Sequence, residues 1–159
     1  LPRGCTPYLP CAVDALLRAV DRAPIRAADV FVDVGAGVGR AALLVHLLTG
    51  ARAIGLEIQP ELVALVEAHA ARLGASGLRM VLGDAAERVG EARDGTVFFL
   101  YTPFGGDRLA RVLDALEPLA RARPIRVCAV DLPLPPRPWL RLAASDGDLA
   151  IHASEPPWG

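Results

Sequence analysis

The chain contains no lysine and no asparagine, and all 17 of its basic residues are arginine. The absence of lysine excludes a Schiff base between a lysine and a substrate, and it excludes a Walker lysine that binds a nucleoside triphosphate. Without asparagine it also lacks the Asn-Pro-Pro-Tyr motif of amino-group methylation. These absences exclude several enzyme classes and are typical of the coding bias of a GC-rich genome.

An excess of positive charge is absent as well. The chain has 18 acidic residues against its 17 arginines, so its formal net charge is −1, and the arginines are scattered along the sequence. Domains that bind nucleic acid concentrate basic residues on one face. We therefore expect no nucleic-acid partner.

Cysteine is scarce, and its spacing does not match a zinc site. Cys5 and Cys11 are separated by five residues, and Cys128 stands alone in an apolar segment. Zinc ligands come in closer pairs. We predict three free thiols, a reducing compartment and no metal; the alternative is that Cys5 or Cys11 forms a disulfide or gates a pocket.

Long apolar runs are missing too. No run reaches the roughly 18 residues of a membrane-spanning helix, and no signal peptide is recognisable. A length of 159 residues and a hydrophobic fraction of 53% fit one domain with buried strands. We expect a cytoplasmic protein, monomeric or homodimeric, without a membrane partner.

The most informative segment runs from Val30 to Glu57. It reads Val-Phe-Val-Asp-Val, then Gly-Ala-Gly-Val-Gly, then a stretch rich in Ala, Leu and Val, then Ala-Ile-Gly-Leu-Glu. This order predicts a buried strand, a glycine turn, a helix and a second strand. Gly35, Gly37 and Gly39 let a ligand lie against the main chain at a helix N-terminus. Glu57 follows at the place where a carboxylate can accept both hydroxyls of a ribose.

The spacing of the turn distinguishes between nucleoside ligands. A dinucleotide fingerprint is G-x-G-x-x-G, whereas this turn is G-x-G-x-G with Asp33 two residues ahead of it. The Asp33 carboxylate would repel a pyrophosphate but attract an ammonium group. S-adenosylmethionine has a ribose, an adenine and a cationic amino-acid tail, and no phosphate, so it fits best. A nicotinamide-dependent oxidoreductase is the weakest alternative.

At these residues the chain resembles the class I S-adenosylmethionine-dependent methyltransferases, whose first motif is acid-x-G-x-G-x-G. The resemblance implies an α/β, Rossmann-like, doubly wound and mostly parallel sheet between two helix layers. It also implies S-adenosyl-L-methionine as cofactor and S-adenosyl-L-homocysteine as product, with no metal. The cofactor-binding residues that it implies are Tyr8, Asp33, Gly35, Ala36, Gly37, Gly39, Glu57, Ile58, Asp84, Ala85 and Tyr101. Among them, Ile58 would pack on the adenine and Asp84 would accept from its amino group.

The same family places residues beside the transferring methyl group after the fourth strand. Here that strand is predicted over Thr96 to Tyr101 and runs into Thr102-Pro103-Phe104. The resemblance therefore makes Tyr101 and Thr102 the catalytic candidates. Pro103 and Phe104 would line the substrate. Tyr8 is expected to close on the methionine end of the cofactor, with packing on the helix layer as the alternative.

The other segments complete a single domain. Helices are predicted over Leu9–Val20, Pro60–Leu73 and Asp107–Leu119, and strands over Leu78–Leu82, Ile125–Asp131, Trp139–Ala144 and Leu149–Ala153. The last two flank an Asp-Gly pair and predict an antiparallel hairpin, which brings the sheet to seven strands. We divide the domain into an N-terminal helix and cofactor-covering segment (1–24), a nucleotide-binding core (25–131), and a proline loop with the hairpin (132–159).

The compact layout is similar to the non-SET protein lysine methyltransferases and indicates a small bacterial member. Because no inserted substrate domain is recognisable, the site is expected to be open. The acceptor is unidentified, with a protein lysine, another amine or a small molecule as the options. The second hypothesis is a methyltransferase-like module that binds the cofactor or a partner without catalysis.

Overall fold

The computed structural model describes residues 10–102 and 104–154. Its strands are β1 (Val30–Val34), β2 (Arg52–Glu57), β3 (Leu78–Leu82), β4 (Val97–Tyr101), β5 (Arg126–Val130), β6 (Leu140–Asp146) and β7 (Leu149–Ser154). Its helices are α1 (Val13–Arg22), α2 (Arg40–Thr49), α3 (Pro60–Arg72), α4 (Ala85–Arg88) and α5 (Gly106–Ala122), with a 3-10 turn η1 (Val89–Glu91).

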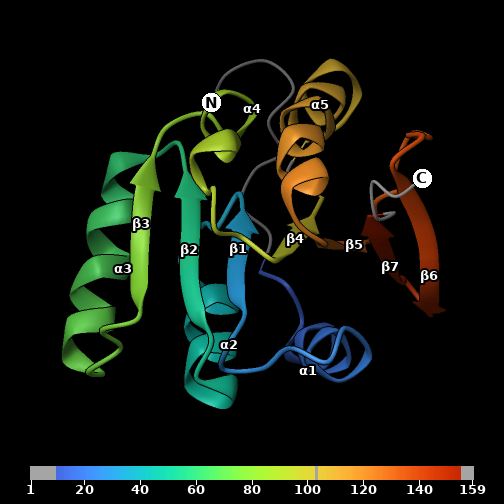
Figure 1. Cartoon of the computed structure of the whole chain (residues 1–159). Helices are drawn as coiled ribbons and strands as arrows, with labels where there is room; N and C mark the ends of the chain where they lie inside the picture. Colours follow the sequence, from blue (N-terminus) through green and yellow to red (C-terminus); the bar gives the residue numbers. More distant parts are fainter. Residues whose placement is uncertain (1–9, 103, 155–159) are drawn as a thin grey trace.

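The strands form one seven-stranded sheet in the order β3-β2-β1-β4-β5-β7-β6 (Figure 1). Strands β1 to β5 are parallel, and β7 runs antiparallel to both β5 and β6. The chain moves outward from β1 to β3 and then restarts on the other side of β1 at β4. The predicted fold class and the C-terminal hairpin are confirmed.

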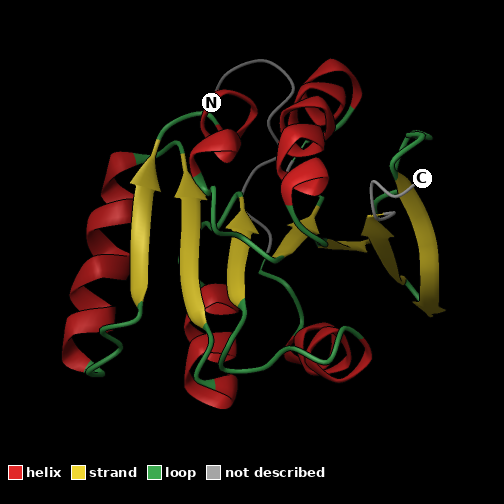
Figure 2. Cartoon of the chain, viewed as in Figure 1, coloured by secondary structure: helices red, strands yellow, loops and turns green. Residues whose placement is uncertain are grey.

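Helices cover both faces of this sheet (Figure 2). Helices α2 and α3 lie on one face and α4 and α5 on the other (Figure 1). This is the arrangement expected of right-handed crossovers when the direction of strand addition reverses at β1. Alternate side chains of β1 pack against the two helix layers. Phe31 lies in the cluster that contains Leu16 of α1, and Val32 lies in the cluster that contains Leu113 of α5. Within the described residues, none of the helices is long and apolar enough to cross a membrane.

Two predicted helix bounds were wrong by three residues or more. The first helix begins at Val13 instead of Leu9, because Ala12 is still extended, with φ −63° and ψ 138°. The α5 helix runs beyond Leu119 to Ala122 and contains Pro118 in its last turns. The short α4 was not predicted at all, since four residues are too few to show a helical period.

The C-terminal hairpin is held against α1 by arginine. Arg18 donates to the main-chain carbonyl of Asp146 at 2.5 Å and to the Asp148 carboxylate at 2.7 Å. The turn also reaches the parallel part of the sheet, because the backbone N–H of Asp131 donates to the Asp148 carbonyl at 2.9 Å. The last two strands are therefore tied to both the helix layer and the end of β5.

A second polar cluster closes the amino ends of β1, β4 and β5. Arg126 lies 2.5 Å from the Asp29 carboxylate and also donates to the Ala23 carbonyl. The same Asp29 oxygen accepts from the Thr96 hydroxyl at 2.7 Å, and that hydroxyl accepts from the backbone N–H of Val30 at 3.0 Å. Three strand ends thus share one hydrogen-bonded network.

We expect Arg126→Met to lower the free energy of unfolding by about 2 kcal/mol, because the mostly buried Asp29 carboxylate would lose its cationic partner. Urea unfolding of the variant and the wild type measures this difference. Arg121→Met is the matched control, since Arg121 pairs with Glu117 on the exposed face of α5 and should cost less than about 0.5 kcal/mol. Equal losses in the two variants would contradict the prediction.

Candidate functional site

Three carboxylates gather at the carboxyl edge of the sheet. Asp33 lies near the end of β1, Glu57 ends β2, and Asp84 follows β3 by two residues. The strands are parallel and adjacent, with Asp33 opposite Gly55 and Glu57 opposite Leu82. Their carboxyl ends therefore meet at one edge of the sheet (Figure 1), where open α/β sheets bind ligands.

The glycine turn lies over the same edge. Gly35, Gly37 and Gly39 have φ of 85°, 54° and 71°, a left-handed region that residues with a Cβ rarely adopt. The backbone N–H groups of Gly35 and Ala36 both donate to the Leu56 carbonyl, at 3.0 and 2.8 Å. The turn is thereby anchored to β2, and the first turn of α2 follows directly from it.

Glu57 is buried and held by the main chain. One carboxylate oxygen accepts from the backbone N–H of Gly37 at 2.8 Å, and the other accepts from Gln59 at 2.9 Å. These two donors fix the orientation of the side chain. Because each carboxylate oxygen can accept more than one hydrogen bond, both oxygens remain able to accept from a ligand.

Asp33 is a buried carboxylate with no countercharge in residues 10–102 and 104–154. Its side chain is 5% exposed, and the ion pairs among the described residues leave it without an arginine partner. Burial raises the pKa of Asp33 to about 7; the backbone N–H of Ala42 opposes the rise, and the negative charge of Glu57 adds to it. A cationic ligand group at this place would supply the missing charge.

Asp84 is partnered on both oxygens. One oxygen accepts from the backbone N–H of Ala86 at 3.0 Å and so caps α4. The other lies 2.6 Å from Arg108 of α5. Sequence reasoning missed both α4 and Arg108; an aspartate directly ahead of Ala-Ala-Glu-Arg is a helix-capping signal that could have revealed the short helix.

The residues after β4 and β5 have an unusual backbone. Thr102 has φ 36° and Asp131 has φ 49°, although neither is glycine. They directly follow Tyr101 and Val130, which are opposite each other in the sheet, so the two strained positions are neighbours at the same edge. Backbone strain of this kind is concentrated at functional sites.

The remaining predicted site residues are distributed as follows. Tyr101, Thr102 and Ile58 are half-buried, and Ala36 and Ala85 are buried. Phe104 is only 6% exposed and packs in the cluster that contains Leu109, so most of its ring belongs to the core. Tyr8 and Pro103 lie outside the described residues.

The thiols are free and buried where the structure describes them, at Cys11 and Cys128. Burial, with the nearby Asp33 charge, raises the pKa of Cys11 to about 11. Arg40 donates to the Cys11 carbonyl at 3.2 Å, which ties the start of α2 to the segment ahead of α1. Among residues 10–102 and 104–154, no group of three His, Cys, Asp or Glu side chains could hold a metal ion.

The sequence model of one protein family, described as the precorrin methyltransferase domain, matches residues 16–130. The chain belongs to this family. The matched residues include β1 to β5, hence the glycine turn and all three carboxylates, and exclude the C-terminal hairpin. The predicted membership of the class I methyltransferases is confirmed.

Solved structures show the same fold. An RNA methyltransferase from Salinibacter ruber, in complex with S-adenosyl-L-homocysteine, is 24% identical with a TM-score of 0.79, over 94% of this chain and 95% of that one. The putative methyltransferase yhhF from Escherichia coli is 21% identical with a TM-score of 0.72, over 96% and 90%. A mutant of MtNAS in complex with S-adenosylmethionine is 17% identical with a TM-score of 0.70, over 91% and 62%.

No curated protein sequence matches the chain. The comparisons do not support the predicted likeness to protein lysine methyltransferases. The description of the matching family names precorrin as the methylated compound, and the name of the Salinibacter ruber protein gives RNA. Proteins named for different substrates share this fold, so the fold does not identify an acceptor.

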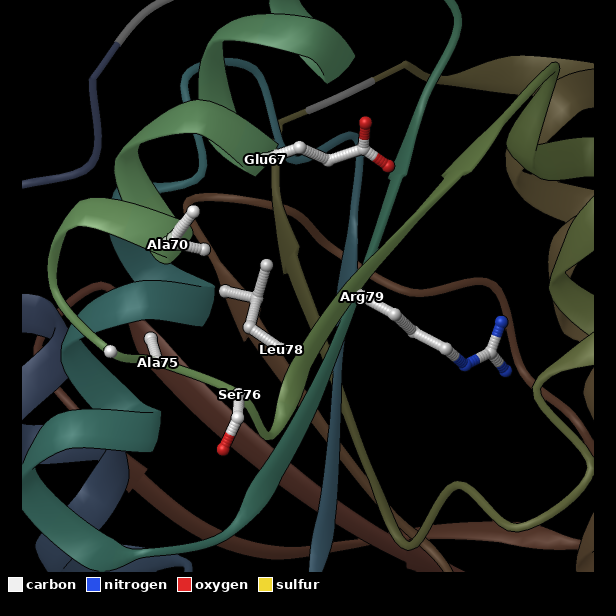
Figure 3. A pocket seen from close by; sticks show the side chains of 8 residues that line it. Glu67, Ala70, Ala75, Ser76, Leu78 and Arg79 are labelled. Atoms are coloured by element: carbon white, nitrogen blue, oxygen red, sulfur yellow. The ribbon is translucent and has the colours of Figure 1, made fainter.

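A shallow groove of about 380 Å³ lies between α3 and β3. Figure 3 shows Leu78 directed toward Ala70 of α3, and Arg79 directed away from that helix. The groove lies at the start of β3, whereas the carboxylates lie at the carboxyl ends of the strands. None of the predicted cofactor residues lines it, so we do not assign the cofactor to this groove.

Proposed function

We propose that this precorrin methyltransferase family member binds S-adenosylmethionine across the carboxyl ends of β1, β2 and β3 and transfers its methyl group. The observation that supports this most directly is the state of the three carboxylates. Asp33 has no countercharge among the described residues, Glu57 is oriented by backbone donors, and Asp84 is fixed at the start of α4. S-adenosylmethionine has three kinds of hydrogen-bond donor that these carboxylates can bind: one ammonium group, two ribose hydroxyls and one adenine amino group.

Each group of the cofactor then has a partner. Asp33 binds the ammonium group, Glu57 accepts from the ribose hydroxyls, and Asp84 accepts from the adenine amino group. Ile58 and Ala85 pack on the adenine, and the turn from Gly35 to Gly39 lies against the ligand. The S-adenosyl-L-homocysteine in the Salinibacter ruber structure supports this cofactor.

Methyl transfer itself requires little acid–base catalysis by the protein. A lone pair of the acceptor forms a bond to the methyl carbon, the carbon–sulfur bond breaks, and its electrons remain on sulfur as the thioether of S-adenosyl-L-homocysteine. The protein aligns the acceptor opposite the sulfur and excludes water. Tyr101 and Thr102, which follow one another at the end of β4, are the residues that we place beside this step.

For the acceptor we propose a precorrin, the compound in the family's description, in preference to RNA or a protein amine. RNA is favoured by the name of a structural neighbour, but the chain has a net charge of −1 and scattered arginines, whereas RNA binding requires a basic surface.

Calorimetric titration with S-adenosylmethionine and S-adenosyl-L-homocysteine tests the cofactor. We expect Glu57→Ala to weaken binding at least about tenfold, because hydrogen bonds to a charged acceptor contribute about 1.5–3 kcal/mol. Glu61→Ala, on the first turn of α3, is the control and should bind like the wild type. A folded wild type that binds neither ligand would refute the proposal.

Transfer of the labelled methyl group from S-adenosylmethionine then identifies the acceptor. The wild type is assayed in parallel with precorrins, with total RNA and with lysine-containing peptides. If precorrin becomes labelled, the proposed acceptor is supported. If RNA becomes labelled instead, the proposal is wrong and RNA is the acceptor. Cofactor binding with no labelled product from any of the three would favour a module that binds the cofactor without catalysis.

A further inference from the structure

Asp84 is the carboxylate of the candidate site that has an arginine partner. Arg108 lies 2.6 Å from it, and the two side chains are only 14% and 16% exposed. The ion pairs of the described residues include neither Asp33 nor Glu57. A largely buried pair of this kind restricts both side chains far more than an exposed pair does.

The pair also joins two elements. Asp84 begins α4, after β3, and Arg108 belongs to the first turn of α5, after β4. The backbone N–H of Ala86 holds the other carboxylate oxygen at 3.0 Å. Asp84 is therefore fixed from two directions, by its own helix and by the helix that follows the predicted methyl-transfer segment.

A guanidinium group only donates hydrogen bonds. Bound to Arg108 and to Ala86, the Asp84 carboxylate keeps lone pairs that can accept from one further donor. The amino group on C6 of adenine is such a donor, whereas the oxygen on C6 of hypoxanthine is an acceptor and would be repelled. A binding group discriminates well only when its orientation is fixed by the residues behind it.

We propose that Arg108 is the positioning residue that gives the cofactor site its preference for adenine, by holding Asp84 toward the amino group of the base. This inference rests on the proposed cofactor site. Arg108 itself does not contact the base; it acts through the carboxylate.

The test compares S-adenosyl-L-homocysteine with S-inosyl-L-homocysteine, which has oxygen in place of the amino group, by calorimetric titration of each variant. We expect the wild type to prefer the adenine compound by about 30-fold or more. Arg108→Met keeps the length of the side chain without its charge and should reduce the preference to about threefold. Arg111→Met, one turn further along α5 and exposed, is the control and should keep the wild-type preference.

Arg108→Lys covers the case in which Arg108→Met does not fold. Lysine keeps the positive charge, but its side chain ends one bond short of the Nη1 atom through which Arg108 donates to Asp84. The preference of this variant should therefore fall below that of the wild type. An unchanged preference in Arg108→Met, or in Arg108→Lys if only that variant folds, would show that the pair is merely structural and overturn the inference. A wild type that binds both compounds equally would overturn it too, whereas a wild type that binds neither would refute the proposed cofactor site.

Discussion

Raising the pH from 5 to 7.5 should strengthen the binding of S-adenosylmethionine by roughly 50- to 100-fold. Only the ionised form of Asp33 attracts the ammonium group, and burial raises the pKa of this side chain to about 7. Below that value the ionised fraction falls about tenfold per pH unit. Titration calorimetry at a series of pH values measures the change, and titrations in two buffers should show release of a proton on binding near pH 6.

Asp33→Asn should abolish this pH dependence and bind weakly throughout. Asparagine keeps an oxygen that can accept from Ala42, but it has no charge to offer the ligand. Asp21→Asn removes an exposed carboxylate of α1 and should leave the wild-type profile intact. A wild-type affinity that does not change between pH 5 and 7.5 would show that Asp33 is not the partner of the ammonium group.

The unfolding equilibrium of the ligand-free protein should respond in the opposite direction. The pKa of Asp33 is raised from 3.8 to about 7 in the folded protein. Below pH 3.8 both states hold the proton; between these values the unfolded chain releases it and the folded protein keeps it, so stability falls as the pH rises. Asp33→Asn should therefore gain up to about 4 kcal/mol relative to the wild type at pH 8 and little at pH 4. Urea unfolding at the two pH values provides the comparison.

Gly39→Ala should lower the free energy of unfolding by about 2–4 kcal/mol, or about 5–15 °C in Tm. A Cβ on Gly39 would lie 2.6 Å from Cγ1 of Val66 in α3, and the backbone there has φ +71°. The contact cost of overpacking is about 1–3 kcal/mol, and the left-handed backbone adds about 1 kcal/mol for a residue with a Cβ. Thermal and urea unfolding measure the total.

A matched glycine separates the two causes. Gly74 has φ +65°, but nothing lies within 4 Å of the position of its Cβ, so Gly74→Ala should show the backbone cost alone. Adding Val66→Ala to Gly39→Ala should recover part of the loss, because it removes the atoms that the new Cβ meets. If Gly39→Ala proved no more harmful than Gly74→Ala, the packing of α2 against α3 would not explain this glycine.

Much of the fold was readable from local patterns. The run from Val30 to Val34 is wholly apolar apart from Asp33, and the glycines that follow it are the residues that adopt positive φ most readily. The Asp-Gly pair before β7 is typical of a hairpin. Each of these signals depends on residues close together in the sequence. The glycine turn and Glu57 were found in the same way, since their spacing alone predicts a ribose-binding unit.

Contacts between distant residues could not be read from the sequence. Arg108 is 24 residues from Asp84, Arg18 is 128 residues from Asp146, and Phe104 turned out to lie largely in the core. The sequence alone determined the order of the strands and of the longer helices, and the glycine turn, because backbone preference and hydrophobic period are local properties. The resemblance to a known family singled out Asp84. Only the tertiary structure decided the state of each acid. Asp33 is buried with no countercharge in the part of the chain that the structure describes, Glu57 is held by backbone donors, and Asp84 is paired with arginine. Burial and electrostatic interaction depend on which strands and helices become neighbours in space.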